Sequence, residues 1–426
     1  MKLFVVCGAR PNFIKIASLL AAIDNHNSRS DDSRKIDYVL VHTGQHYDKQ
    51  MSENFFADLD LPKPHVNLGV GSASHAEQTA EIMKRFEPLV IEQRPDVVLV
   101  VGDVNSTIAC SLVASKIHYP DAGGSGSGSQ PNRGSRPLIA HVEAGLRSFD
   151  RSMPEEINRI LTDALSDFLF TSEPSANHNL EKEGIPGEKI FFVGNTMIDT
   201  LLKHRAKCRK SPILERLGLA RNEPGGPANG VVRPYGVVTL HRPSNVDDPQ
   251  TFGGIVAALC EIANRLPLIF PVHPRTMGRI REYGFESNFK LAKDRSPEVS
   301  EGIYAIEPLG YIDFMQLMSN SRLILTDSGG MQEESTILGI PCITLRENTE
   351  RPCTLEYGDN CLVRIEKDQI INAALSQIEK LQRVAGFGDI GSTVEKSKNM
   401  RPPLWDGLAG ERTIKILVEK VMGSRQ

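Results

Sequence analysis

Short apolar runs alternate with helical periodicity along most of the chain. In the first half, runs rich in Val, Ile, Leu and Phe lie at 2–7, 37–43, 96–102, 137–142, 168–172 and 190–194. Between them, apolar residues recur every three or four positions, as in SHAEQTAEIMKRFEPLVIEQ, which is typical of amphipathic helices. A second series begins after residue 234 with YGVVTL, LPLIFPV, IYAIEP, SRLILT and PCITL. Continuous apolar strands that alternate with helices predict parallel sheets covered by helices on both faces.

The two series predict two doubly wound α/β domains, because 426 residues exceed what one ordinary core holds. We expect a first domain at 1–201, a linker or insertion at 202–234, and a second domain at 235–408. A C-terminal helix, expected at 409–423, is a candidate to pack back on the first domain. Two segments rich in Gly, Pro and Ser, 122–135 and 222–234, are interpreted as inserted surface loops. Ligands of such sheets bind at the carboxyl ends of strands, and two facing domains create a cleft. We therefore expect the functional residues at strand ends.

Composition narrows the class of protein. The net charge of −4 leaves no basic excess for a nucleic-acid backbone. The seven cysteines are scattered and never form a C-x-x-C pair, which favours reduced thiols in a cytoplasmic protein over disulfides or a zinc site. The apolar run in MKLFVV is too short for a signal peptide, and no run approaches the ~20 apolar residues of a membrane span. We expect no nucleic-acid and no membrane partner.

Charged side chains follow the strands of the first domain. The first strand ends in GARPNFIKIA, where Arg10 and Lys15 accompany a helix start, and we favour an anion site over surface ion pairs. Gln45 and His46 in TGQHYD can bind polar groups, although a satisfied loop histidine is the commoner explanation. Asp103 in GDVNST is explained equally well as a helix N-cap or as a catalytic carboxylate.

The segment HVEAGLRSFDRSMPEEINR places three glutamates shortly after an apolar strand. Glu143, Glu155 and Glu156 can hold a helix end, pair with arginines, or move protons, and the pattern alone does not choose between these roles. Arg147 and Arg159 are candidate partners for the carboxylates. The segment is therefore the first candidate for acid–base chemistry.

Strand ends of the second domain carry groups suited to a nucleotide. In DSGGMQEES, a serine and two glycines open a helix and can cradle phosphate oxygens, while a glutamate within the helix can accept from ribose hydroxyls. An N-capped helix with early glutamates would have the same sequence. The other strand ends offer His241, Arg242 and His273, which we interpret as polar contacts to a ligand rather than metal ligands. The residues concerned in DSGGMQEES and in the later RENTERP are Ser328, Gly329, Gly330, Glu333, Glu334, Arg346, Glu350 and Arg351.

Two common nucleotide motifs are absent from the sequence. It has no G-x-x-x-x-G-K-[ST] loop, which argues against ATP-type phosphoryl transfer. It also has no G-x-G-x-x-G after a strand, and no tyrosine with a lysine four residues later, which removes support for an NAD-dependent sugar epimerase.

From residue 4 to about residue 363, ordered motifs resemble the non-hydrolysing UDP-N-acetylglucosamine 2-epimerase family. They are GARPNFIK, TGQHYD, GSASHAEQTA, GDVNST, HVEAGLRS, MPEEINR, VGN, TLHRP, VHP, DSGGMQEES and LRENTERP. The resemblance implies two Rossmann-like domains of GT-B architecture, a UDP-sugar in the cleft, a homodimer, and no metal or other cofactor. It also implies reversible inversion at C2, which interconverts UDP-GlcNAc and UDP-ManNAc through UDP elimination and a bound 2-acetamidoglucal.

The resemblance also assigns roles. Asp103, Glu143 and Glu155 match the family's catalytic carboxylates, and His241 matches a histidine near the diphosphate. The positions that hold the nucleotide or its phosphates are Arg10, Lys15, His273, Ser328, Gly329, Gly330, Glu334 and Arg351. The positions implicated in allosteric binding of a second UDP-GlcNAc are Gln45, His46 and Arg242. Glu156 lies about 100° around the helix from Glu155 and is interpreted as structural.

Departures from the family pattern leave alternatives open. HRPSN replaces the common HRREN, and Arg351-Pro352-Cys353 replaces ERPE, so the sugar and the allosteric behaviour are not decided. A modified substrate of the UDP-2,3-diacetamido-glucuronate type would need an extra cation, which Arg147 or Arg151 could supply. A hydrolysing 2-epimerase and a GT-B glycosyltransferase are further alternatives. ManNAc units for surface polysaccharide are the expected use of the product.

Overall fold

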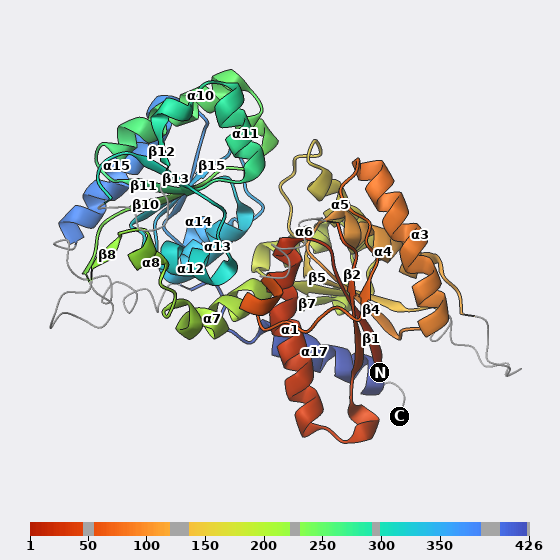
Figure 1. The fold of residues 1–426 in the computed structure, drawn as a ribbon. Coiled ribbons are helices and arrows are strands. Elements are labelled where there is room, and N and C mark those ends of the chain that lie inside the picture. Colours follow the sequence, from red (N-terminus) through yellow and green to blue (C-terminus); the bar gives the residue numbers. More distant parts are fainter. Residues whose placement is uncertain (46–54, 120–135, 222–230, 292–298, 385–400, 424–426) are drawn as a thin grey trace, which may run out of the picture. The chain divides into compact units, whose positions relative to one another are not determined.

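The computed structural model describes residues 1–45, 55–119, 136–221, 231–291, 299–384 and 401–423, and these form two compact units. Unit 1 comprises Met1–Lys203 and Pro403–Gln426, and unit 2 comprises His204–Pro402 (Figure 1). Part of the stretch expected as a linker lies in unit 2, where it forms α8 (Ile213–Arg216) and the short strands β8 (Ala220–Arg221) and β9 (Val231–Val232).

Unit 1 is a parallel sheet of seven strands in the order β3-β2-β1-β4-β5-β6-β7. Its strands are β1 (Lys2–Cys7), β2 (Asp37–His42), β3 (Val66–Asn67), β4 (Val97–Val101), β5 (Leu138–Ala144), β6 (Phe168–Thr171) and β7 (Ile190–Phe192). Its helices are α1 (Arg10–Arg29), η1 (Asp32–Arg34), α3 (His75–Gln93), α4 (Asn105–Lys116), α5 (Pro154–Leu165), α6 (Pro174–Lys182), η2 (Gly187–Lys189), α17 (Ala409–Leu417) and η5 (Val418–Met422). One further helix, α7 (Thr196–Cys208), begins in unit 1 and ends in unit 2. The strand order reverses between β1 and β4, the point at which such sheets bind ligands.

Unit 2 is a second parallel sheet of seven strands, in the order β12-β13-β11-β10-β14-β15-β16. Its strands are β10 (Gly236–Thr239), β11 (Leu268–Pro271), β12 (Phe289–Leu291), β13 (Ile303–Ile306), β14 (Leu323–Thr326), β15 (Cys342–Leu345) and β16 (Asn360–Val363). Besides α8, its helices are α9 (Pro243–Val246), α10 (Pro249–Ala263), α11 (Pro274–Glu282), η3 (Glu286–Asn288), α12 (Tyr311–Ser319), α13 (Gly329–Leu338), α14 (Cys353–Tyr357) and α15 (Lys367–Val384). The predicted fold class of two parallel, doubly wound α/β domains is confirmed.

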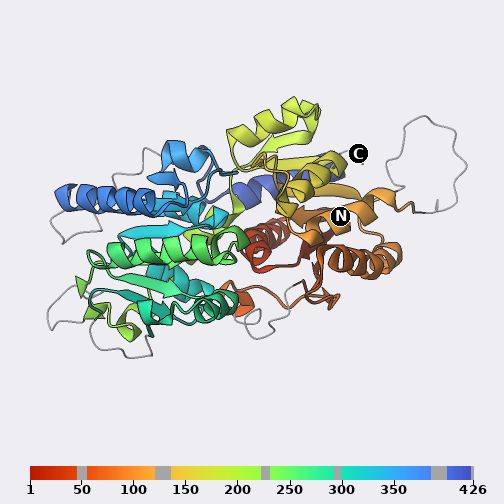
Figure 2. The ribbon, with the colours of Figure 1, turned by 90° about the horizontal axis from the view of Figure 1, so that it is seen from above.

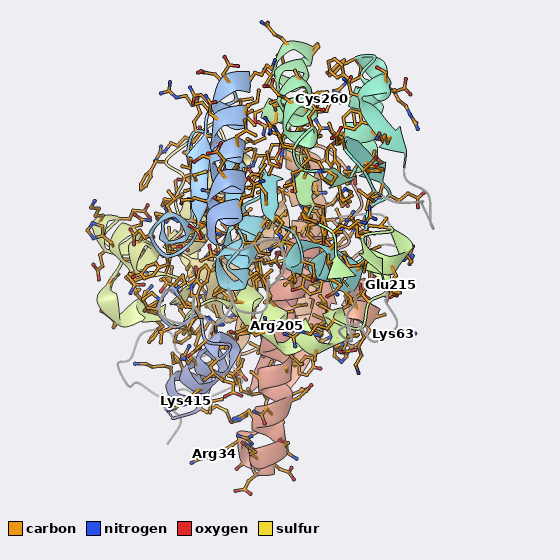
Figure 3. All side chains as sticks on the ribbon, turned by 90° about the vertical axis from the view of Figure 1, so that its left-hand side faces the viewer. Arg34, Lys63, Arg205, Glu215, Cys260 and Lys415 are labelled. Carbon is orange, nitrogen blue, oxygen red and sulfur yellow. The ribbon has the colours of Figure 1, made fainter. Side chains whose placement is uncertain are left out.

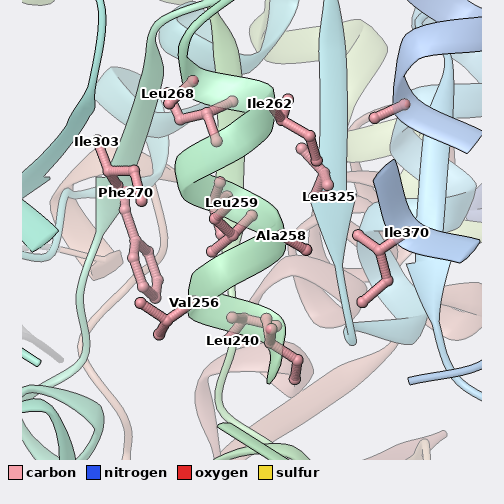
Figure 4. Close-up of a cluster of buried hydrophobic side chains, with 14 of the residues drawn as sticks. Leu240, Val256, Ala258, Leu259, Ile262, Leu268, Phe270, Ile303, Leu325 and Ile370 are labelled. Carbon is pink, nitrogen blue, oxygen red and sulfur yellow. The ribbon is translucent and has the colours of Figure 1, made fainter. Parts of the chain in front are cut away.

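Helices cover both faces of the sheets (Figure 2). In the sheet of unit 2, neighbouring side chains along a strand enter different cores. In β10, Val238 joins a cluster built from α10, α11 and α15, whereas Val237 joins a cluster that includes α8 and α12. Figure 4 shows Leu259 and Ile262 of α10 among the strand residues of the first cluster. This two-sided burial explains why the strands read as continuous apolar runs rather than as alternating ones.

The last described segment of the chain returns to unit 1, where α17 packs on α1. The indole of Trp405, the only tryptophan, is buried and donates to the carbonyl of Ser172 at 2.8 Å. At the start of α17, the amide of Gly410 donates to Oδ2 of Asp199 at 2.7 Å. Figure 3 shows Lys415 on this helix and Arg34 in η1. The first unit is therefore built from both ends of the chain.

Cysteines form no disulfide in the structure. All seven are free, most of them are buried, and Cys260 lies half-buried on α10 (Figure 3). Among the helices in the described part of the chain, none is long and apolar enough to cross a membrane.

Candidate active site

In unit 1, Lys15 and Glu143 meet at the carboxyl edge of the sheet. Nζ of Lys15 lies 2.7 Å from Oε1 of Glu143, and each side chain is 5% exposed. Lys15 is on the first turns of α1, and Glu143 lies near the end of β5, two strands from β1. The residue predicted to bind an anion is thus paired with a carboxylate predicted to be catalytic.

Glu143 has a strained backbone. Its φ is +73°, a conformation that non-glycine residues rarely adopt, and the pairing of β5 with β6 shifts register between Val142 and Ala144. Such conformations cost about 1–3 kcal/mol and cluster at functional sites. The bulge turns Glu143 out of the regular alternation of β5 and towards Lys15.

Asp103 lies two residues after the end of β4 and is held by Arg159 of α5. Nη1 of Arg159 lies 2.5 Å from Oδ2 of Asp103, whose side chain keeps 24% exposure. The backbone carbonyl of Asp103 also accepts from Nδ2 of Asn158 at 2.9 Å. The preceding Gly102 has φ +67°, and a Cβ there would come within 2.7 Å of Nζ of Lys15. A small residue at 102 therefore lets the Asp103 turn pass close to the Lys15–Glu143 pair.

The two helical glutamates have different environments. Glu156 is buried and accepts from the amides of Ser148 at 3.0 Å and Phe149 at 2.9 Å, and Nη2 of Arg159 lies 2.7 Å from its Oε2. Burial raises the pKa of Glu156, but the Ser148 amide and Arg159 outweigh it, so the pKa lies below its usual value. Glu155, in contrast, is exposed in the first turn of α5. Glu156 supports the loop and Arg159, while Glu155 is accessible to a ligand.

A buried ionic network beneath this edge was not found by sequence reasoning. His141 places Nδ1 2.6 Å from Oδ1 of Asp163 and Nε2 2.9 Å from the carbonyl of Gly102. Oδ2 of Asp163 lies 2.8 Å from Nη1 of Arg147, which also makes two bonds to Glu183, at 2.7 and 2.6 Å. Burial raises the pKa of Asp163, yet the charges of His141 and Arg147 lower it overall. A histidine inside an apolar strand was the available signal, but its partners are distant in sequence.

The ion pairs of Arg147 bear on whether the protein can bind an acidic sugar. Because Arg147 is 1% exposed at its side chain and binds two carboxylates, it is not available to an acidic substrate. Arg151, the other cation considered from the sequence, is exposed in the turn before α5.

Gln45 contacts the start of α4. Its Oε1 accepts from the amide of Ser106 at 3.2 Å and from the Ser106 hydroxyl at 2.8 Å. Arg10, at the start of α1, is half-buried, with its guanidinium 5.9 Å from the ring centre of Phe55. His46, considered together with Gln45 from the sequence, lies outside the described residues.

In unit 2, adjacent strands β10 and β14 bring His241 to Asp327. Nδ1 of His241 lies 2.9 Å from Oδ1 of Asp327, and the imidazole is 55% exposed while the carboxylate is fully buried. Oδ2 of Asp327 accepts from the amides of His241 and Arg242, at 3.0 and 2.9 Å. Burial raises the pKa of Asp327, but the hydrogen bond and charge of His241 lower it overall. The sequence places Asp327 in the DSGGMQEES motif but contains no signal that links it to His241.

Arg242 and His273 follow the neighbouring strands β10 and β11 and are the N-cap residues of α9 and α11. Nε of Arg242 donates to the backbone carbonyl of Asp327 at 2.9 Å, and the side chain is half-buried. His273 is exposed at the N-cap of α11, where its Nδ1 accepts from the amide of Arg275 at 3.3 Å.

Ser328, Gly329 and Gly330 follow Asp327 and open α13, as the sequence predicted. All three residues are half-buried, and the amide of the N-cap Ser328 donates to Oγ1 of Thr326 at 3.0 Å. The amides of Gly329 and Gly330 begin a ten-residue helix, whose N-terminus favours an anion. A Cβ on Gly329 would come within 2.7 Å of Oε1 of Glu350, so this turn lies against the loop after β15.

Buried charges surround the rest of α13. Arg351 lies with Nε 2.7 Å from Oε1 of Glu333, and Nη2 of Arg346 lies 2.8 Å from Oε2 of Glu350. Burial, reinforced by the charge of Glu333, raises the pKa of Glu334 to about 8. Arg351, predicted to contact a nucleotide, is thus ion-paired with a buried glutamate.

Each unit therefore carries a distinct chemistry at its strand ends. Unit 1 holds two carboxylates on buried cations, together with the exposed Glu155. Unit 2 offers an oriented imidazole and a helix N-terminus suited to phosphates. Within the described ranges, no group of three or more His, Cys, Asp or Glu side chains is arranged to hold a metal ion.

Comparison with known proteins identifies the family. A family model described as UDP-N-acetylglucosamine 2-epimerase matches residues 28–123 and 128–418. The UDP-N-acetylglucosamine 2-epimerase of Methanocaldococcus jannaschii is 39% identical over 421 residues, which is 98% of this chain and 99% of the relative. The UDP-2,3-diacetamido-2,3-dideoxy-D-glucuronate 2-epimerase of Pseudomonas aeruginosa is 38% identical over 383 residues, which is 89% of this chain and 93% of the relative. The crystal structure of the Methanocaldococcus jannaschii UDP-GlcNAc 2-epimerase in complex with UDP-GlcNAc and UDP aligns with a TM-score of 0.77 at 39% identity, covering 98% of this chain and 99% of that chain. The chain belongs to the UDP-N-acetylglucosamine 2-epimerase family.

Proposed function

We propose that the protein interconverts UDP-GlcNAc and UDP-ManNAc by the non-hydrolysing route. One observation carries the proposal: Asp103 and Glu143 follow or end the adjacent strands β4 and β5, and each is held by its own buried cation. The C2 proton of the sugar is not acidic, since no carbonyl stands beside it. A pair of carboxylates that addresses C2 from different sides meets the need for acid–base groups on both faces.

The proposed reaction begins with elimination. The C1–O bond breaks with its electron pair passing to the β-phosphate oxygen, while a carboxylate takes the C2 proton and the C–H electrons form the C1=C2 bond of 2-acetamidoglucal. UDP then adds back to C1 while a proton returns to the opposite face of C2. We assign the proton transfers to Asp103, Glu143 and Glu155. Lys15 and Arg159 hold the first two in place, as their ion pairs indicate.

Unit 2 supplies the nucleotide contacts in this proposal. The amides of Gly329 and Gly330 and the hydroxyl of Ser328 bind phosphate oxygens, as a helix N-terminus favours. His241 stabilises the charge that develops on the departing diphosphate. Other groups hold the nucleotide or its phosphates, namely Arg10, His273, Glu334 and Arg351.

Solvent deuterium provides the test. Incubated with UDP-GlcNAc in deuterated water, the protein is expected to incorporate deuterium at C2 and to produce UDP-ManNAc, both followed by NMR. Asp103→Asn and Glu143→Gln are expected to lose exchange while retaining UDP binding by calorimetry, and Glu356→Gln, exposed on α14, serves as the control. Accumulation of UDP and free ManNAc would indicate a hydrolysing enzyme. Sugar transfer to an acceptor without exchange at C2 would indicate a glycosyltransferase.

A second candidate substrate is UDP-2,3-diacetamido-glucuronate, the substrate named for the Pseudomonas aeruginosa relative. The buried ion pairs of Arg147 count against it, leaving the exposed Arg151 as the cation for its carboxylate. We therefore expect kcat/KM to favour UDP-GlcNAc, and Arg151→Ala to leave that value within about threefold, since replacing an exposed surface residue usually has a small effect. A reversed preference that Arg151→Ala abolishes would make the diacetamido sugar the substrate.

We further propose a cytoplasmic homodimer that provides ManNAc units for surface polysaccharide. Light scattering of the purified protein tests the dimer, and loss of ManNAc from the polysaccharide of a deletion strain tests the pathway.

A further inference from the structure

We propose that Asp327 is a positioning residue that fixes the ring of His241 with Nδ1–H towards the buried carboxylate and Nε2 towards the ligand. The inference rests on the proposed function for its consequence, but its structural part can be tested without turnover. His241 is the only member of the pair that reaches solvent, with 55% exposure against 0% for Asp327.

The two oxygens of Asp327 make different contacts. Oδ2 accepts from the amides of His241 and Arg242, at 3.0 and 2.9 Å, and from Nδ2 of Asn245 at 3.3 Å. Oδ1 lies 2.9 Å from Nδ1 of His241 and has a longer contact, 3.3 Å, with the His241 amide. The hydrogen bonds to Oδ2 already connect the end of β14 to the turn after β10. The contact between Oδ1 and the ring is therefore not needed to hold these two segments together.

The bond to Oδ1 determines what the other ring nitrogen presents. A carboxylate accepts only, so the ring must carry its proton on Nδ1. In a neutral imidazole, Nε2 would then present a lone pair to the ligand, whereas in an imidazolium Nε2 presents a second N–H. A diphosphate on the exposed side places a second acceptor opposite Asp327, and an imidazolium can donate to both anions at once, from Nδ1–H and from Nε2–H. Burial of Asp327 keeps this interaction out of water, where it would be weaker.

In the reaction, this N–H donates to the β-phosphate oxygen that leaves C1. When the C1–O bond breaks, its electron pair remains on that oxygen, and the Nε2–H hydrogen bond stabilises the new charge. On re-addition the same oxygen attacks C1 and the hydrogen bond weakens again. No proton is consumed at His241, so the ring returns to its starting state after each inversion.

The placement of Asp327 directly before Ser328 strengthens the assignment. The turn that ends β14 thus supplies the carboxylate for His241 and, from the next residue, the helix start proposed to bind phosphates. One backbone segment sets both groups, so the imidazole and the amides have a fixed relation within unit 2.

Asp327→Asn is the sharpest perturbation. Its amide oxygen can keep the contacts of Oδ2, while its NH2 group faces Nδ1 and forces that nitrogen to accept. We expect kcat to fall about 100- to 1,000-fold, the usual range for loss of one hydrogen-bond donor that stabilises a developing negative charge, with a much smaller change in KM. The kcat of His241→Gln should fall by a similar factor. The double variant should be no slower than His241→Gln, because Asp327 acts through His241.

Asn245→Ala is the matched control. It removes a contact to Oδ2 and leaves the contact between Oδ1 and the ring, so it should lower stability with kcat changed less than about threefold. Long-range proton–nitrogen NMR of histidine-labelled protein, with the His241 signals identified by their loss in His241→Gln, reports which ring nitrogen carries the proton. We expect Nδ1 to be protonated in the wild type and in Asn245→Ala, and unprotonated in Asp327→Asn.

Two outcomes would overturn the inference. One is the same His241 protonation pattern in wild type and Asp327→Asn; the other is a double variant whose losses multiply, as independent structural effects do. If the wild type shows no exchange at C2 while the NMR patterns are as expected, the proposed function fails and the positioning role of Asp327 stands.

Discussion

Replacing Glu334 with glutamine is expected to stabilise unit 2 by an amount that grows with pH. Burial and the neighbouring Glu333 raise the pKa of Glu334 from its ordinary 4.5 to about 8. The carboxyl group is therefore neutral in the folded protein at pH 7, although it ionises in the unfolded chain. A folded-state pKa above the unfolded value means that stability is fully present below pH 4.5 and is lost as the pH rises to 8.

The size of the effect follows from the shift. Each pH unit between these two values costs the folded state about 1.4 kcal/mol. The cost is then about 2 kcal/mol at pH 6 and about 5 kcal/mol at pH 9. Glutamine has no such titration, so the stability difference between Glu334→Gln and wild type should widen by about 3 kcal/mol from pH 6 to pH 9. Any cost of burying the amide shifts the whole curve without changing its slope.

Hydrogen exchange of the peptides in α13, measured at several urea concentrations, gives the free energy of opening unit 2 at each pH. This local measurement is needed because a two-unit protein need not unfold in one step. Glu356→Gln, on the exposed face of α14, should show no pH-dependent difference. A difference between Glu334→Gln and wild type that stays constant from pH 6 to pH 9 would refute the reasoning.

Three further results are expected in unit 1. Burial raises the pKa of Asp199 to about 6, so the free energy of unfolding of the wild type should fall by up to about 3 kcal/mol between pH 4 and pH 7 because of this residue, and Asp199→Asn should lack this fall. Urea unfolding at each pH measures the difference, and parallel stability curves for the two proteins would contradict the prediction. Lys15→Met leaves Glu143 buried without its cation, which should lower the free energy of unfolding by about 3–5 kcal/mol, and adding Glu143→Gln should recover part of the loss. In Arg159→Lys, the lysine cannot bridge Asp103 and Glu156 as the arginine does, so Asp103 should move and kcat should fall about 10- to 100-fold with the circular dichroism spectrum unchanged. A kcat equal to that of the wild type would show that the contact is dispensable.

The strands and their ends were predictable because strands covered on both faces have continuous apolar sequences, and polar residues follow each of these runs. The same reasoning located Asp103, Glu143 and His241, since parallel strands end at one edge of a sheet. Their partners were not predictable. The pairing of Asp327 with His241 spans 86 residues, and that of Lys15 with Glu143 spans 128. Such pairings depend on strand order, which a local pattern does not contain.

Local conformation was equally hidden. Nothing in HVEAGLR indicates that Glu143 takes a positive φ, because that geometry depends on the register shift against β6. For the same reason the sequence suggested an anion site at Lys15, whereas the bulge brings a carboxylate to it.

The return of the chain to unit 1 has a consequence for synthesis on the ribosome. Domains usually fold in the order in which they emerge, at roughly 5–20 residues per second. Here unit 1 begins first but lacks Trp405 and α17 until all of unit 2, residues 204–402, has been made. The nascent first unit therefore waits roughly 10–40 s with the surface of α1 that receives α17 uncovered. Unit 2, which is continuous in sequence, can complete its fold before the unit that precedes it.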